Sequence, residues 1–145
     1  MEQRISLITL GVSDMKAAGQ FYEALGWKRV ETPDNLIVFD LIGQSLGLYP
    51  KAKLAQDLGI ESETLSGSGS ITLSQNLRSK DEVDALMERA RSIGASILKE
   101  AQEVFWGGYH GYFVDLDAHI WEVAFNPFSP LGPNNEFCWN GFGGS

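Results

Sequence analysis

The sequence predicts an α+β fold made of two copies of a βαβββ module. Three observations predict it. The order of one strand, one helix and three strands can be read twice along the chain. Each predicted helix ends at a glycine, Gly26 or Gly94, the residue that C-terminal caps favour. Each copy closes on a strand followed by proline, Pro50 or Pro127.

The composition is that of one globular domain and disfavours several kinds of partner. Of the 145 residues, 43% are hydrophobic and 21% are charged. The net charge of −8 argues against nucleic acid and acidic membranes, because both are negatively charged. No apolar run approaches the roughly 20 residues that span a bilayer, and no signal-peptide pattern opens the chain. The single cysteine, Cys138, suits a reducing compartment, so we expect a cytoplasmic protein.

The first module is predicted to span residues 4–50. It opens on a strand, residues 4–12, which is rich in Ile, Leu and Thr. Ser13 offers an N-cap, and apolar residues then recur at helical spacing up to Gly26. Three short strands follow, WKRVET, NLIVFDL and SLGLYP, separated by turn-forming residues.

A connector, residues 51–67, precedes the second module, residues 68–127. The connector begins with a segment that suits a short surface helix and continues as a polar, Gly/Ser-rich stretch. In the second module a strand over 69–75 is followed by a capping box, Ser79 to Glu82, and a helix. The tripeptide Ile-Thr-Leu at 8–10 recurs at 71–73. Three more strands are expected in SILKEAQEVFW, YHGYFVDL and HIWEVAFNP.

The tail, residues 128–145, is predicted to be neither helix nor sheet, because it is rich in Pro, Gly and Asn. It nevertheless carries four aromatic residues, which a disordered segment seldom does. Two interpretations stay open, a tail that wraps over the domain or a partner chain and a frayed tail.

Two segments resemble the vicinal oxygen chelate superfamily, which includes glyoxalase I, bleomycin-resistance proteins and extradiol dioxygenases. ISLITLGVSDMKAAGQFYEALGWKRV resembles its opening unit and WGGYHGYFVDLDAHIWEVAFNP its closing hairpin, so the resemblance covers about residues 4–127. Leu116 stands where proline is usual and Ala118 where glycine is usual, which affects the geometry of the hairpin turn. The resemblance implies a single domain over residues 1–127, in which the curved sheets of the two modules surround a small-molecule cleft.

The resemblance also implies four positions at which metal-dependent members hold a divalent ion. Carried over one at a time, these positions fall on Leu7, Gly47, Ser70 and Glu122. Only Glu122 offers a hard ligand, and one such ligand is too few for a tight site. We therefore expect no cofactor, and Glu122 would ligate only if a metal were present.

Glu122 and His110 are the candidate catalytic residues. Alternation along its strand puts Glu122 on the face that looks into the cleft of the family fold, as a general base, a ligand acceptor or a structural hydrogen-bond partner. His110 lies in a glycine-rich strip and suits general-acid work, although a surface position is the alternative. His119 is assigned to the hairpin turn.

The residues expected to contact a ligand come from the predicted cleft strands, their aromatic side chains and the glycine-rich strip. They are Leu7, Thr9, Phe39, Gly47, Tyr49, Ser70, Thr72, Trp106, Gly108, Tyr109 and Phe113.

The leading hypothesis is a metal-independent member of the superfamily that binds a small organic molecule, aromatic or amphipathic, in its cleft. One alternative is a metal-dependent lyase or isomerase resembling glyoxalase I, which would need Ni, Zn, Mn or Fe. A second is a non-catalytic interaction module. The expected partner is a small molecule, not nucleic acid or a membrane, and the resemblance implies a homodimer. Whether the protein is an enzyme stays open.

Overall fold

A computed structural model describes residues 1–65 and 69–142 of the chain. The chain forms two compact units. Unit 1 comprises Met1–Ser70 and Leu116–His119, and unit 2 comprises Ile71–Asp115 and Ile120–Ser145. Each unit holds one sheet, as two α+β modules require. Within the described residues no helix combines the length and the apolar character needed to cross a membrane.

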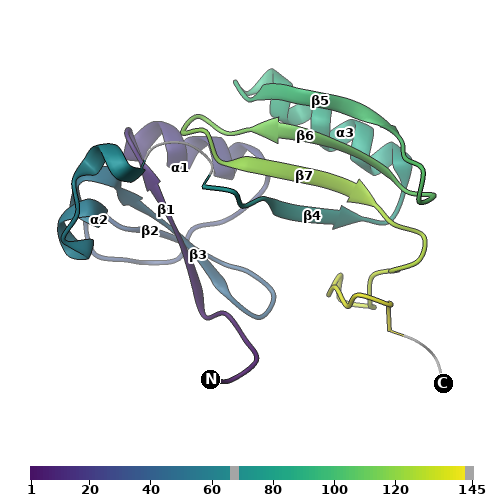
Figure 1. The fold of residues 1–145 in the computed structure, drawn as a ribbon, viewed down its shortest axis with the longest axis horizontal. Helices are drawn as coiled ribbons and strands as arrows, with labels where there is room; N and C mark the ends of the chain where they lie inside the picture. Colours follow the sequence, from purple (N-terminus) through teal and green to yellow (C-terminus); the bar gives the residue numbers. More distant parts are fainter. Residues whose placement is uncertain (66–68, 143–145) are drawn as a thin grey trace. The chain divides into compact units, whose positions relative to one another are not determined.

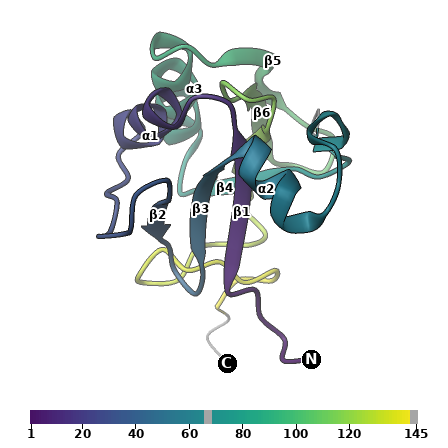
Figure 2. The same ribbon diagram turned by 90° about the vertical axis from the view of Figure 1, so that its left-hand side faces the viewer.

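Unit 1 contains a three-stranded sheet in the order β1-β3-β2 (Figure 2). β1 runs parallel to β3, and β2 runs antiparallel to β3. The elements in chain order are β1 (Leu7–Val12), α1 (Met15–Ala24), β2 (Ile37–Asp40), β3 (Ser45–Pro50), α2 (Lys51–Leu58) and a 3-10 helix, Ser62–Leu65.

Helix α1 begins one residue later than the sequence indicates. Its N-cap is Asp14, whose carboxylate accepts a hydrogen bond from the backbone N–H of Ala17, and not Ser13. The buried face of α1 includes Phe21 and Tyr22. Gly26 follows at φ 115°, a left-handed conformation that only glycine adopts without strain.

An aromatic cluster forms the core of unit 1. The Tyr22 ring stacks on Trp27 at 5.4 Å between centroids, and Trp27 lies 5.5 Å from Phe39 of β2. Tyr22 and Phe39 are each 1% exposed. These rings fasten α1 and the segment after it to β2.

The strand predicted over WKRVET does not form. Only one bridge occurs there, between Arg29 and Phe39. Lys28, Arg29 and Val30 are all exposed, so the segment has no alternating buried face that would hold a longer strand. The first module is therefore one strand short of the second.

Unit 2 contains a four-stranded sheet in the order β4-β7-β6-β5 (Figure 1). β4 runs parallel to β7, and the other neighbours are antiparallel. Helix α3 packs against this sheet, with Val83, Met87 and Ala90 buried. The elements are β4 (Leu73–Leu77), α3 (Lys80–Ser92), β5 (Ser96–Glu103), β6 (Tyr109–Val114) and β7 (Ile120–Phe125).

The capping box at the start of α3 is confirmed with one change. Ser79 accepts a hydrogen bond from the backbone N–H of Glu82. The Glu82 carboxylate accepts from the backbone N–H of Arg78, one residue before the cap.

The register of the repeat differs from the one that the tripeptide suggests. The strand predicted over 69–75 is Leu73–Leu77, because Gly69 and Ser70 both have positive φ and form a turn. The two side-chain N-caps, Asp14 and Ser79, lie 79 − 14 = 65 residues apart. The tripeptide match has an offset of 71 − 8 = 63 and is therefore out of register by two residues.

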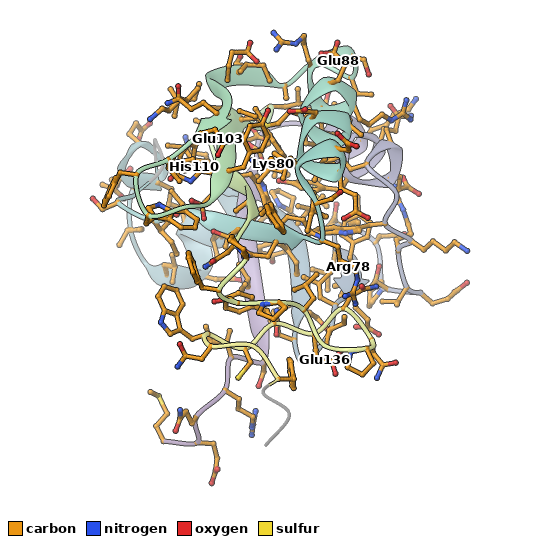
Figure 3. All side chains as sticks on the ribbon, turned by 90° about the vertical axis from the view of Figure 1, so that its right-hand side faces the viewer. Arg78, Lys80, Glu88, Glu103, His110 and Glu136 are labelled. Carbon is orange, nitrogen blue, oxygen red and sulfur yellow. The ribbon has the colours of Figure 1, made fainter. Side chains whose placement is uncertain are left out.

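The described part of the tail is anchored to unit 2. The Arg78 guanidinium donates to the Gly132 carbonyl at 2.6 Å and to Asn135 Oδ1 at 3.0 Å. Arg78 lies beside the tail segment that carries Glu136 (Figure 3). Ser129 is buried, and its hydroxyl donates to the Trp139 carbonyl. The described tail holds no helix or strand, as predicted, and these contacts favour a packed tail over a frayed one.

We expect Gly111→Ala to destabilise the protein by about 1–3 kcal/mol. A Cβ at Gly111 would lie 2.9 Å from the Ala101 nitrogen and 3.0 Å from the Lys99 oxygen, where the pairing of β5 with β6 shifts in register. The matched control is Gly47→Ala in β3, where the nearest atom, Leu7 Cδ1, would lie 3.5 Å away. Urea unfolding should show a change within about 0.5 kcal/mol for the control. Equal stabilities of the two variants would contradict the close approach.

Candidate functional site

Unit 2 presents one face of its sheet to α3 and the other away from it. A Cβ at Gly111 would meet the Met87 side chain of α3, so odd-numbered residues of β6 face the helix. Phe113 stacks on Trp121, its partner in β7, on the same side. Because side chains alternate along a strand, Tyr112 and its partner Glu122 face away from α3.

Four polar side chains meet on the face opposite α3, and we call them the Glu122 cluster: Ser74, His110, Tyr112 and Glu122. Ser74 Oγ donates to Glu122 Oε1 at 2.9 Å. Tyr112 Oη donates to Glu122 Oε2 at 3.0 Å, and His110 Nδ1 lies 2.8 Å from the same oxygen. The donors come from β4 and β6, on either side of β7. One carboxylate therefore links three neighbouring strands.

The Glu122 carboxylate sits in a partly buried and well-satisfied environment. Its side chain is 24% exposed and that of His110 only 12%. Three side-chain donors replace the water that this carboxylate loses on burial. Burial, and then the hydrogen bond and charge of Glu122, raise the pKa of Tyr112 above its usual value. Tyr112 is thus a neutral donor to Glu122 near neutral pH.

Aromatic side chains frame the His110 ring. Trp106 meets it edge-on, with 6.0 Å between centroids, and Tyr112 does so at 5.1 Å. Gly108 makes the position of Trp106 possible, because a Cβ there would lie 1.9 Å from the indole. The structure thus brings the predicted residues Trp106, Gly108, His110 and Glu122 together.

Other predicted residues of unit 2 lie away from the Glu122 cluster. Phe113 is 2% exposed in the core. Tyr109 faces α3, where its hydroxyl donates to Asp84 at 2.5 Å. That hydrogen bond, followed by burial, raises the pKa of Tyr109 to about 12. Thr72 is exposed and directly precedes β4.

In unit 1 the predicted residues fall into two groups. Thr9 pairs with Gly47, and a Cβ at Gly47 would contact Leu7, so these three share one face of the sheet. Phe39 pairs with Leu46 and therefore lies on the opposite face, in the aromatic core.

Two further predicted residues of unit 1 have local roles. Burial, and then the charge and hydrogen bond of Asp57 in α2, raise the pKa of Tyr49. Ser70 lies in a turn at φ 60°, outside any strand.

Sequence reasoning missed part of the Glu122 cluster. Tyr112 was not singled out, although its place two residues after His110 puts both on one face of a strand. The His110 side chain is only 12% exposed and lies against Glu122, so it is more buried than an ordinary surface histidine. A polar face was expected for the strand before α3, which is β4. Ser74 of β4 lies on that face and pairs with Glu122 of β7.

The hairpin turn between β6 and β7 belongs to unit 1. His119 Nε2 donates to the Gly11 carbonyl of β1 at 3.0 Å, and Asp117 Oδ1 accepts from the backbone N–H of Ser13 at 2.9 Å. His119 therefore has a structural role, which ties the turn to β1. Ala118 adopts φ 69°, the left-handed conformation for which glycine is better suited.

The residues at the family's metal positions do not fit a divalent ion. In the first module Leu7 lies seven residues before the N-cap Asp14. The residue seven before the N-cap of the second module, Ser79, is Thr72. Thr72, and not Ser70, is therefore the position in the second module that corresponds to Leu7. The other three positions hold an aliphatic side chain, a glycine and a hydroxyl group. All three are poor ligands for a divalent ion. Within residues 1–65 and 69–142, no group of three or more His, Cys, Asp or Glu could hold a metal. The donor chemistry thus argues against the metal site.

A model of the Glyoxalase/Bleomycin resistance protein/Dioxygenase superfamily matches residues 4–123 of the chain. The chain belongs to this superfamily, and the fold class predicted from the sequence is confirmed. None of the curated proteins compared with the chain matches it.

Solved structures agree with this assignment. A glyoxalase-related enzyme from Fulvimarina pelagi is 36% identical, with a TM-score of 0.88 over 95% of this chain and 99% of that one. A lactoylglutathione lyase from Agrobacterium tumefaciens is 21% identical, with a TM-score of 0.65 over 87% and 96%. A genomically encoded fosfomycin resistance protein from Listeria monocytogenes is 22% identical, with a TM-score of 0.67 over 87% and 95%. The last two likenesses show the shared fold alone.

We expect the phenol of Tyr112 to ionise above its ordinary pKa of 10.0. Because the folded-state pKa is raised, this group stabilises the fold below pH 10, and the contribution is lost as pH rises through the folded value. Glu122→Gln should lower the pKa of Tyr112 only in part, since burial is the largest cause. Absorbance titration at alkaline pH, with Tyr112→Phe to assign the signal, measures the shift. An unchanged titration in Glu122→Gln would contradict the coupling.

Proposed function

We propose that this chain is a metal-independent member of its superfamily that binds a small organic molecule at the Glu122 cluster. The observation that carries the proposal is the carboxylate of Glu122 with its three side-chain donors on the sheet face opposite α3. A few convergent polar groups beside aromatic surface are typical of small-molecule sites.

The chemistry of the cluster favours a neutral ligand with an aromatic or apolar body. Trp106 and Tyr112 offer ring surface beside His110. Glu122 and the net charge of −8 disfavour an anionic ligand. Hydroxyl and imidazole groups can exchange hydrogen bonds with a polar group of the ligand.

The metal-dependent alternative, a lyase or isomerase like glyoxalase I, finds less support. It needs several hard or imidazole ligands with open positions, and the corresponding residues of this chain include an aliphatic side chain, Leu7, and a glycine, Gly47. The likeness to a lactoylglutathione lyase is 21% in identity, which carries the fold and not the reaction.

We expect small aromatic alcohols or phenols to bind and to raise the melting temperature of protein treated with EDTA. Glu122→Gln should weaken their affinity by about tenfold or more, because a hydrogen bond to a charged group contributes roughly 1.5–3 kcal/mol. A thermal-shift screen followed by calorimetry of the hits measures both effects.

The matched control for this experiment is Glu100→Gln. Glu100 lies in β5 of the same sheet, but its side chain is 67% exposed and pairs with Arg91. Its affinity should equal that of the wild type. Binding that requires stoichiometric Ni, Zn, Mn or Fe would overturn the metal-independent proposal.

We also propose a cytoplasmic homodimer in which the tail takes part. Support comes from apolar surface on the tail, which is anchored to unit 2 through Arg78. Large exposed apolar side chains that gather in one segment are often covered by a partner chain. The exposed fractions are Phe128 66%, Phe137 49%, Trp139 74% and Phe142 50%.

Light scattering at micromolar concentration should give twice the mass of one chain. Trp139→Ser should shift the equilibrium toward monomer, since it removes apolar area from the proposed contact. Phe105→Ser is the control, because Phe105 is fully exposed but lies in the β5–β6 connection and outside the tail. A wild-type protein that stays monomeric would refute the dimer.

A further inference from the structure

The proton on the His110 ring is placed by Glu122. A carboxylate only accepts hydrogen bonds, so the Nδ1–Oε2 distance of 2.8 Å requires Nδ1 to carry a proton. The neutral ring then has its lone pair on Nε2. Because Ser74 and Tyr112 occupy other acceptor positions of the carboxylate, Glu122 is held in the orientation that fixes this tautomer.

The Nε2 atom of His110 is accessible although the ring is largely covered. Among the described residues Nε2 has no hydrogen-bond partner, and none of their buried side-chain nitrogens or oxygens is left unsatisfied. Nε2 is therefore exposed to solvent, although the His110 side chain as a whole is only 12% exposed. A polar atom left open in such a setting is available to a ligand.

The other histidine has the opposite arrangement. His119 Nε2 donates to the Gly11 carbonyl, so this nitrogen carries a proton and no free lone pair. The chain thus supplies one imidazole with an open acceptor and one with that position occupied, and the second serves as an internal reference.

We propose that Nε2 of His110 is the proton-accepting atom of this site and that Glu122 is its positioning residue. The substrate class is a neutral small molecule with a hydroxyl or thiol group next to an aromatic body. This role rests on the proposed function, since it assigns chemistry to the same cluster.

The proposed step is one proton transfer. The O–H or S–H bond of the substrate breaks, its electron pair stays on oxygen or sulfur, and the proton forms an N–H bond at Nε2. His110 becomes an imidazolium whose charge is balanced by Glu122, as in other carboxylate–imidazole pairs. Glu122 acts here only as the hydrogen-bond acceptor of Nδ1, which positions the ring.

The ¹⁵N NMR signals of the imidazole rings test the tautomer in ligand-free protein. In the wild type we expect a protonated Nδ1 and an unprotonated Nε2 at His110. Glu122→Gln should give a mixture of tautomers, because an amide can either accept or donate. Glu100→Gln should keep the wild-type signals. A protonated Nε2 at neutral His110 in the wild type would overturn the proposal.

Diethyl pyrocarbonate, which attacks unprotonated imidazole nitrogen, tests access to Nε2. We expect His110 to be modified about tenfold or more faster than His119 at near-neutral pH, with peptide mass spectrometry to assign the sites. Equal rates, or faster modification of His119, would contradict an open Nε2. His110→Asn, which keeps a polar side chain, should leave only the slow reaction.

A matched pair of probes tests the substrate class. Protonated 4-nitrophenol should slow the modification of His110, whereas 4-nitroanisole, which lacks the hydroxyl proton, should protect it less. Equal protection by both, or protection by neither, would overturn the assignment of a hydroxyl or thiol substrate.

The two proposals fail in different ways. If calorimetry finds ligands that depend on Glu122 but Nε2 is protonated or unreactive, the proton-accepting role of His110 fails alone. If Nε2 is open and reactive but no small molecule binds, the proposed function fails and the tautomer stands.

Discussion

The parallel pairing of the first strand of each module with its last strand is the constraint on which the structure depends. β1 lies beside β3, and β4 lies beside β7. A parallel pair needs a long connection, which each module supplies with a helix and further strands. In unit 2 this pairing sets Ser74 directly opposite Glu122 and fixes which face of β7 carries the carboxylate. The antiparallel pairing of β6 with β7 then adds Tyr112, and His110 lies diagonally across from Glu122.

Both modules have this parallel pair of strands, but the side chains on the paired residues differ between them. At the equivalent pair, unit 1 has Thr9 opposite Gly47, and no charged group. Unit 2 has Ser74 opposite Glu122, with an imidazole and a phenol in contact. A partly buried carboxylate needs hydrogen-bond donors in place of water, and unit 2 supplies three of them. The carboxylate with its three side-chain donors is thus a feature of unit 2 that the equivalent pair of unit 1 lacks.

Much of the fold could be predicted from the sequence, because hydrophobic period, caps and helix-ending glycines are local signals. They located both helices of the repeat and six of the seven observed strands closely. The register of β4 was misplaced because a tripeptide match carries no information on hydrogen bonding, whereas the turn at Gly69 and Ser70 does. The strand over WKRVET failed because its residues lack a buried face, which depends on a neighbour that the sequence does not reveal.

By itself the sequence determined both helices of the repeat, most of the strands and the family resemblance, and it singled out Glu122 as the candidate residue. Only the tertiary structure decided which groups meet. It brought His110 and Tyr112 onto Glu122, moved Phe39 and Phe113 into the cores, and occupied Nε2 of His119 while leaving that of His110 open. The reason is that the role of a side chain in a sheet depends on its face and its cross-strand neighbours, and both follow from register and helix packing.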